Sequence, residues 1–218
     1  KLSTGMRINQ AADDAAGLQI SNNLRADVKI LGQAMRNAND GLGRLAVADG
    51  VMEEATNILT RAAQLAEQAA SGTTSSAGRA ALNAEFTEIK AALNRLDADT
   101  KIDGNEVFGS SLTIRVGEST AESVTLNSVN IDSTNLTVTE LLTTSDSASL
   151  ALAQITTAIE NVSSNRGTIG AKQQRLFTIA NSLGITQENI QAAESQIRDA
   201  DVASEVVNLT KFQILSQS

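Results

Sequence analysis

Apolar residues recur at every seventh position along two long stretches of the chain. A seven-residue repeat of this length keeps one seam of an α-helix facing a partner helix. The seam of the first half consists of Leu24, Leu31, Ala38, Leu45, Met52, Leu59 and Ala66. That of the second half consists of Ile155, Val162, Ile169, Leu176, Leu183, Ile190 and Ile197. A flanking row follows the first seam at a spacing of four and is expected to pack against neighbours: Val28, Met35, Leu42, Asp49, Thr56, Ala63 and Ala70.

These repeats predict three helices. The first runs from about Ala12 to Ala70, and the second from about Ala77 to Asp99, folded back antiparallel on the first. The third runs from about Ala148 to at least Ala200, and Leu209 is the farthest end that the pattern allows. Glycines near Leu42 weaken the first helix by about 1 kcal/mol each relative to Ala. We expect packing to offset that cost and the helix to continue through them.

Between the second and third helices the pattern changes to alternation of apolar and polar residues. This alternation predicts two strands, Leu112–Val116 and Ser123–Leu126, joined as one β-hairpin through residues 117–122. Residues 127–149 are rich in Ser, Thr and Asn, and we expect a surface excursion there with a short helical turn near Thr139–Leu142.

The predicted fold class is therefore mainly α: an elongated antiparallel bundle of two long helices and one shorter helix, with a small β-hairpin region in the middle. We expect one rod-like domain with three parts. These are an N-terminal arm (residues 1–111), the hairpin and loop region (112–147) and a C-terminal long helix that packs on the arm (148–218).

Composition narrows the possible functions. The chain has no Pro, Cys or His, and it carries a net charge of −8. Without Pro, long helices meet no obligatory break. Without His and Cys, the usual zinc sites and most nucleophile–base pairs are excluded, so we expect no catalytic residue, no metal and no cofactor. The negative charge argues against nucleic acid and anionic membranes as partners, and no apolar run approaches the length of a membrane span.

Four blocks of sequence resemble bacterial flagellin. They are residues 2–24 (LSTGMRINQAADDAAGLQISNNL), 32–41 (GQAMRNANDG), 103–108 (DGNEVF) and 197–215 (IRDADVASEVVNLTKFQIL), and they occur in the order of that family. The resemblance implies an extracellular filament subunit for motility, not an enzyme. It would be exported by the flagellar type III route without a cleavable signal peptide.

The implied partners are other flagellin subunits, the export chaperone and the filament cap. Flagellins extend further at both ends, so we expect a rod-domain core that stays monomeric by itself. An alternative is a flagellin-like hook–filament junction protein.

Residues in the two N-terminal blocks are candidates for contacts between subunits. They are Arg7, Asn9, Asp13, Asp14, Met35, Arg36, Asn37, Asn39 and Asp40. For the first four, local helix capping explains them equally; for the other five, subunit contact is favoured over a solvated face.

The resemblance also implies a second surface, because flagellins carry a motif that Toll-like receptor 5 recognises. In the matching segment, residues 59–68, the residues Arg61, Leu65 and Gln68 fit the receptor-contacting pattern, and Glu88 supplies a further candidate. Gln64 stands where the family has an acidic residue, so receptor recognition is expected to be weakened. The alternative is an ordinary exposed helical face.

Overall fold

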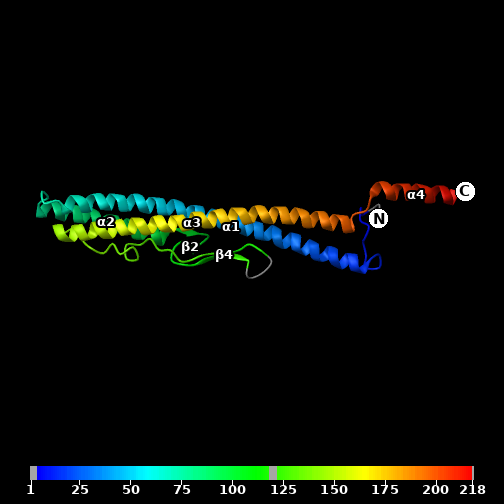
Figure 1. Ribbon diagram of the computed structural model, residues 1–218, viewed down its shortest axis with the longest axis horizontal. Helices are drawn as coiled ribbons and strands as arrows, with labels where there is room; N and C mark the ends of the chain where they lie inside the picture. The colour runs from blue at the N-terminus through cyan, green and yellow to red at the C-terminus, as the bar shows by residue number, and fades with distance from the viewer. Residues whose placement is uncertain (1–3, 118–121, 218) are drawn as a thin grey trace. The chain divides into compact units, whose positions relative to one another are not determined.

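The computed structural model describes residues 4–117 and 122–217 (Figure 1). Within these residues lie four helices: α1 (Ala15–Ala70), α2 (Ser76–Asp99), α3 (Ser145–Arg198) and α4 (Val202–Gln217). The strands described are β1 (Lys101–Ile102), β2 (Asn105–Glu106), β3 (Leu112–Arg115) and β4 (Ser123–Leu126). The mainly α fold is confirmed, and α1 continues without a break through the glycines near Leu42.

The chain divides into two compact units, which are described separately. The first unit comprises Lys1–Ala38, Arg115–Ser123 and Thr178–Ser218, and the second comprises Asn39–Ile114 and Val124–Phe177. The long helices α1 and α3 contribute one segment to each unit.

Each helix begins where a polar side chain accepts a hydrogen bond from a backbone N–H of the first turn. The caps are Asp14 for α1 (3.0 Å), Ser75 for α2 (3.1 Å), Thr144 for α3 (3.1 Å) and Asp201 for α4 (2.9 Å). Such caps satisfy backbone donors that the helix itself leaves free. Short polar residues in the linkers therefore fix where the helices start.

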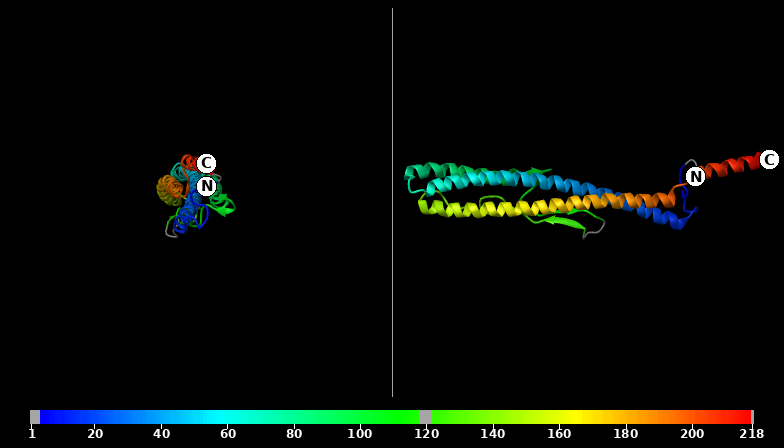
Figure 2. Two further views of the ribbon diagram at one scale, coloured as in Figure 1. Left: turned by 90° about the vertical axis from the view of Figure 1, so that its right-hand side faces the viewer. Right: turned by 45° about the horizontal axis from the view of Figure 1, so that its top comes forward.

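The predicted heptad seam forms the core of the second unit. Here α1, α2 and α3 run alongside one another (Figures 1 and 2). Seam residues of α1 and α3 in this unit are at most 1% exposed, and α2 adds Phe86 and Leu93 at 0% and 1%. These seam residues are Leu45, Met52, Leu59, Ala66, Ile155, Val162, Ile169 and Leu176.

A row of alanines in α1 is buried just as deeply as the seam. Ala48, Ala55, Ala62 and Ala69 each lie three residues after a seam residue and are 0% to 3% exposed. The flanking row expected from the sequence, one residue further along, is only half-buried. Small side chains at buried positions allow helix axes to approach closely, at the lower end of the usual 8–10 Å.

An ion pair joins α1 to α3 on the half-buried flank of the second unit. Arg166 Nε lies 2.8 Å from Asp49 Oδ1, and Arg166 Nη2 lies 3.3 Å from Glu53 Oε2. Asp49 interrupts the expected apolar row because its carboxylate has this partner on the facing helix.

The strands form two small sheets beside the helices. In the β1–β2 hairpin, Asp103 and Gly104 both adopt positive φ (53° and 75°), which is the turn geometry that matches strand twist. Strand β3 pairs with β4, as predicted, and the predicted connection at residues 118–121 lies outside the described residues. The absence of a side chain at Gly41 lets Ile114 of β3 pack against α1. A Cβ at position 41 would lie only 2.4 Å from Ile114 Cδ1.

The segment between β4 and α3 is not the surface excursion that its composition suggested. Four of its apolar side chains are 0% to 3% exposed: Ile131, Leu136, Val138 and Leu142. Side chains of α2 accept its backbone N–H groups: Asp97 from Ile131 (2.9 Å), Asn94 from Ser133 (2.8 Å) and Asn83 from Leu142 (2.8 Å). Buried backbone donors need such partners, so the segment is anchored along α2.

The expected helical turn at Thr139–Leu142 is also wrong. The turn lies at residues 133–137, where Asp132 Oδ1 accepts from the N–H groups of Thr134 (2.9 Å) and Asn135 (3.1 Å). An Asp side chain that bonds the backbone two residues on initiates turns in this way.

The seam continues into the first unit but is less well covered. Leu24 and Leu31 of α1 and Leu183, Ile190 and Ile197 of α3 are all only half-buried. Helix α2 belongs wholly to the second unit, so it does not cover the seam in the first.

The third helix ends earlier than predicted. It stops at Arg198, and Asp201 starts the separate helix α4. Between them Asp199 forms a β-bridge with Met6, and Ala200 N donates to Gly5 O at 3.0 Å. The prediction of a continuous helix through Ala200 is wrong because the backbone at Asp199 and Ala200 forms hydrogen bonds with residues near the N-terminus.

Ala55→Leu tests the close packing along α1. We expect a loss of about 1–3 kcal/mol of unfolding free energy, because a larger side chain must displace well-packed neighbours. Ala46→Leu is the matched control, since Ala46 is exposed on the same helix and should change stability by no more than about 0.5 kcal/mol. Urea unfolding followed by circular dichroism measures both, and equal midpoints would contradict close packing at Ala55.

Candidate subunit-contact and receptor-contact surfaces

The acidic candidates before α1 are held in local hydrogen bonds. Asp13 Oδ2 accepts from the backbone N–H of Asn9 and of Gln10, each at 3.0 Å. Asp14 Oδ1 accepts from Gly17 N at 3.0 Å and caps α1. The capping function considered for these residues is therefore present. The side chains of the candidates Asn9, Asp13 and Asp14 also remain exposed.

Arg7 ties the start of the chain to the end of α3. Its N–H donates to Arg198 O at 2.7 Å, and its Nη2 donates to Ile197 O at 2.7 Å. A guanidinium that bonds the last carbonyls of a helix also complements the negative end of the helix dipole. Arg7 is thus an internal link of the first unit.

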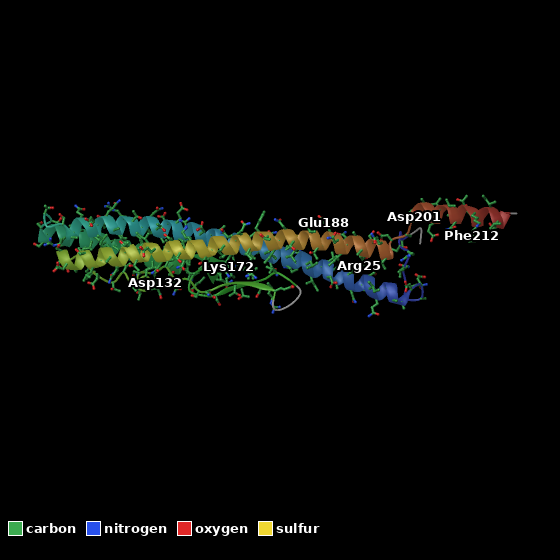
Figure 3. The ribbon with its side chains drawn as sticks, in the orientation of Figure 1. Arg25, Asp132, Lys172, Glu188, Asp201 and Phe212 are labelled. Carbon is green, nitrogen blue, oxygen red and sulfur yellow. The ribbon has the colours of Figure 1, made fainter. Side chains whose placement is uncertain are left out.

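A second link of the first unit lies one turn into the seam. Arg25 of α1 (labelled in Figure 3) pairs with Glu194 of α3, with Nη2 and Oε1 3.0 Å apart. Sequence reasoning missed this pair, although both residues flank seam positions.

The candidates Arg36 and Asn37 belong to a polar chain on α1. Arg36 donates to Gln33 Oε1 through Nε (3.1 Å) and Nη2 (2.7 Å), and Gln33 Nε2 donates to Asn37 Oδ1 (2.9 Å). Asn37 Nδ2 then donates to the carbonyl oxygen of Arg115 at the end of β3 (3.2 Å). Asn37 therefore fastens the hairpin to α1, while Arg36 stays exposed.

Asn39 and Asp40 are exposed and border a shallow depression of the second unit. Arg44 and Val47 of α1 and Asp103 of the β1–β2 turn complete its rim. Val47 is 44% exposed there, so the depression mixes apolar and charged surface. Met35, the remaining candidate of this block, is half-buried.

The receptor candidates lie where α1 runs beside α2. Arg61 donates to Glu85 Oε1 of α2 through Nη2 at 2.6 Å and to Gln64 Oε1 through Nη1 at 3.4 Å. The Arg61 and Glu85 side chains are 54% and 46% exposed. The sequence match did not include Glu85, which a helix-to-helix ion pair places in the same patch.

Leu65 differs from the other receptor candidates because its side chain is buried, with 1% exposed. Gln64 and Gln68 are exposed on α1. Glu88 of α2 is 82% exposed and lies 4.0 Å from Arg95. The arrangement presents Arg61, Gln64, Gln68 and Glu88 outward and packs Leu65 beneath them.

Helix α4 carries a concentration of exposed large apolar side chains. Asp201 precedes this helix and Phe212 lies on it (Figure 3). The apolar residues are 45% to 66% exposed, and a shallow groove lies along four of them. They are Val202, Val206, Val207, Leu209, Phe212, Ile214 and Leu215.

Shifted pKa values occur away from these surfaces. Burial raises the pKa of the Asp97 carboxyl. The hydrogen bond from Ile131 N lowers this pKa, but by less than burial raises it. Burial also acts to raise the pKa of Asp132, but hydrogen bonds from Asn135 and Thr134 outweigh it and hold this pKa below its usual range. Both carboxyls anchor the segment before α3, so their environment is explained by folding.

Among residues 4–117 and 122–217, no group of acidic side chains is placed to hold a metal ion. Within the same residues, no helix combines the length and apolar character needed to span a bilayer.

Asp14→Ala tests the cap of α1. We expect a loss of about 0.5–2 kcal/mol of unfolding free energy, because the variant frees a backbone donor in the first turn. Asp14→Asn keeps the acceptor and should lie within a few tenths of a kcal/mol of the unsubstituted chain. Urea unfolding compares the three proteins. If Ala and Asn behaved alike, the cap would contribute nothing.

Two family models match the chain and together cover most of it. The bacterial flagellin N-terminal helical region matches residues 1–113, and the bacterial flagellin C-terminal helical region matches residues 152–218.

Curated relatives match over the full length of the chain. A flagellin of Halalkalibacterium halodurans is 35% identical over 224 residues, covering 100% of this chain and 82% of that protein. The flagellar filament 30.7 kDa core protein of Treponema maltophilum is 33% identical over 240 residues, covering 100% of this chain and 83% of that protein.

Solved structures share the fold. The crystal structure of Bacillus cereus flagellin matches with a TM-score of 0.61 and 26% identity, covering 68% of this chain and 88% of that one. A putative flagellar hook-associated protein from Vibrio parahaemolyticus matches with a TM-score of 0.70 over 86% of this chain and 100% of that one. At 12% identity, the second likeness concerns the fold alone.

Proposed function

The chain belongs to the bacterial flagellin family, and from that premise we propose how its surfaces serve a filament. It is a structural subunit of the flagellar filament, which lies outside the cell, and it assembles with other flagellin subunits.

The exposed apolar surface of α4 is the observation that carries this proposal. Soluble monomers rarely leave a contiguous apolar surface of this kind in water, and such surfaces mark contacts between proteins. Seven large apolar side chains of α4 are at least 45% exposed. Copies of the chain would gain free energy by burying them against one another.

Among the candidates of the N-terminal blocks, we assign subunit contact first to the exposed residues Arg36, Asn39 and Asp40. Asp13, Asp14 and Arg7 have internal hydrogen bonds, so we assign them the task of shaping the segment before α1. We assign Met35 and Asn37 a supporting position next to the contact residues, and Asn9 a supporting position in the segment before α1.

Asp40→Ala tests the proposed subunit contact. Because Asp40 is exposed, we expect the unfolding midpoint to stay unchanged while filament assembly weakens severalfold, by loss of a polar contact between copies. The substitution is made in a full-length flagellin that contains this chain and is expressed in a flagellin-deleted bacterium, and filament length and swimming are compared with the unsubstituted protein.

Glu54→Ala is the matched control, since Glu54 is an exposed acidic residue farther along α1. Filaments of normal length from Asp40→Ala would remove this residue from the contact. Failure of the unsubstituted full-length flagellin that contains this chain to form filaments would refute the filament assignment itself.

We also propose recognition by Toll-like receptor 5 through the patch around Arg61. The exposure of Arg61, Gln64, Gln68 and Glu88 in one region of α1 and α2 supports it. Leu65 contributes from beneath by fixing α1 in the core. The ion pair between Arg61 and Glu85 holds the guanidinium in place before any partner arrives.

Arg61→Ala tests the receptor proposal. Interface residues that matter cost more than about 1 kcal/mol when truncated, so we expect roughly tenfold lower potency in cells that report Toll-like receptor 5 activation. Stability should change by at most about 1 kcal/mol, because an exposed ion pair contributes little. Arg175→Ala, at an exposed arginine of α3, is the control, and equal potency of the two variants would exclude Arg61.

Export by the flagellar type III route, with a dedicated chaperone and a filament cap as partners, completes the proposal. The alternative, a hook–filament junction protein, is supported only by likeness of fold. Fluorescent labelling of the chain in cells separates the two: label along the whole filament fits the subunit, and label confined to its base fits the junction.

A further inference from the structure

The junction of α3 and α4 interrupts a stretch of sequence that is compatible with a single helix. No Gly or Pro occurs between residues 185 and 217, so no residue there obliges a helix to end. Nevertheless α3 ends at Arg198 and α4 begins at Val202. The break therefore depends on contacts from elsewhere in the chain.

Residues 5–7, which we call the latch, form three hydrogen bonds with this junction. Arg7 donates from its backbone N–H to Arg198 O and from Nη2 to Ile197 O, both at 2.7 Å. Ala200 N donates to the carbonyl oxygen of the glycine in the latch at 3.0 Å. Figures 1 and 2 show the N-terminal segment beside the junction. The latch thus occupies the carbonyls and the N–H group that the next turn of α3 would use.

The latch is itself held against the start of α1. Ile8, the next residue, is 2% exposed, and a Cβ at Gly17 would lie 2.7 Å from Ile8 Cδ1. Ile8 therefore packs on the first turn of α1. Gly5 has a φ of 66°, which Gly adopts without strain. The position of the latch on α1 and the break between α3 and α4 are consequently coupled.

The hydrogen bonds at the break have counterparts in a continuous helix. Besides the three bonds of the latch, Asp201 Oδ1 accepts from Ala203 N at 2.9 Å and from Ser204 N at 3.2 Å. In a continuous helix the N–H groups of residues 200–204 would instead bond to the carbonyls of residues 196–200. The exchange loses no hydrogen bond overall. Two arrangements that are balanced in this way make a bistable element, which small changes can shift.

We propose that the latch is a conformational switch. When it is bound to the junction, α3 and α4 are separate helices, and when it detaches, they join into one. The inference goes beyond the proposed function and does not depend on it, because the switch lies within a single chain. It gives a route by which a change near the N-terminus reaches the apolar residues of α4. Conversely, a partner that binds the continuous helix more tightly would detach the latch.

A double variant, Arg7→Ala with Asp201→Ala, tests the switch. It removes side-chain bonds that exist only at the break, and Ala favours a helix. By nuclear magnetic resonance we expect the Cα chemical shifts of residues 199–201 to move to helical values. Amide hydrogen exchange at Val202, the first N–H of α4, should slow roughly tenfold because Arg198 O becomes its acceptor.

Arg25→Ala is the matched control, because it removes an ion pair to Glu194 in the same unit and leaves the latch intact. The shifts of residues 199–201 and the exchange at Val202 should stay as in the unsubstituted chain. If this control also produced helical shifts, general loosening of the unit would explain the effect and the proposal would be overturned.

Ala200→Pro distinguishes a joined helix from any other cause of slow exchange. Pro removes a helical N–H and disfavours a helical conformation at the preceding residue, whereas Asp199 already forms a β-bridge with Met6. Adding Ala200→Pro to the double variant should abolish the helical shifts and restore fast exchange at Val202. Slow exchange that persisted with Pro at this position would overturn the proposal.

Two results of the double variant itself would also overturn the inference. An unchanged junction would show that the latch does not maintain the break. Shifts of an unstructured chain at residues 199–201, with exchange at Val202 no slower than before, would show that α3 and α4 do not join when the latch is weakened.

Discussion

The close packing of α1 in the second unit is the constraint on which the other features there depend. The buried alanines Ala48, Ala55, Ala62 and Ala69 allow neighbouring helices to lie near enough for polar side chains to reach across. Arg61 then meets Glu85, Arg166 meets Asp49, and Ser145 Oγ donates to the last carbonyl of α1 at 2.6 Å. A wider separation would break these contacts, and the loss from each partly exposed ion pair would be at most about 1 kcal/mol.

The same principle explains how a polar segment becomes part of the core. Residues 127–144 have the composition of a solvated loop, but the side chains of Asn83, Asn94 and Asp97 on α2 accept their backbone N–H groups. Once those donors are satisfied, burying Ile131 and Leu142 becomes favourable. Composition alone misled because the acceptors lie roughly 35–60 residues earlier in the sequence and nothing in the local pattern identifies them.

The sequence pattern was sufficient for features set by local periodicity and capping. The seam and the strands β3 and β4 follow from residues close together in the chain. It was insufficient where distant backbone competes, as at Asp199, whose bridge to Met6 ends α3. The sequence analysis placed the larger apolar residues Leu42 and Met35 in the packed row and overlooked the alanines. Helices that lie close together favour the smaller side chain at their contact. Among the candidate residues, the family match identified Arg61 but could not reveal its partner Glu85.

The distribution of charge indicates what must drive association between copies. Arg61, Arg166 and Arg25 are paired within the chain, and the 25 acidic residues outnumber the 17 basic ones. With a net charge of −8, subunits can assemble only if burial of apolar and uncharged surface outweighs repulsion. Apolar burial contributes roughly 25 cal/mol per Å², and α4 provides such surface. Exposed apolar surface such as that of α4, and not the pairing of opposite charges, is therefore what favours contact between copies.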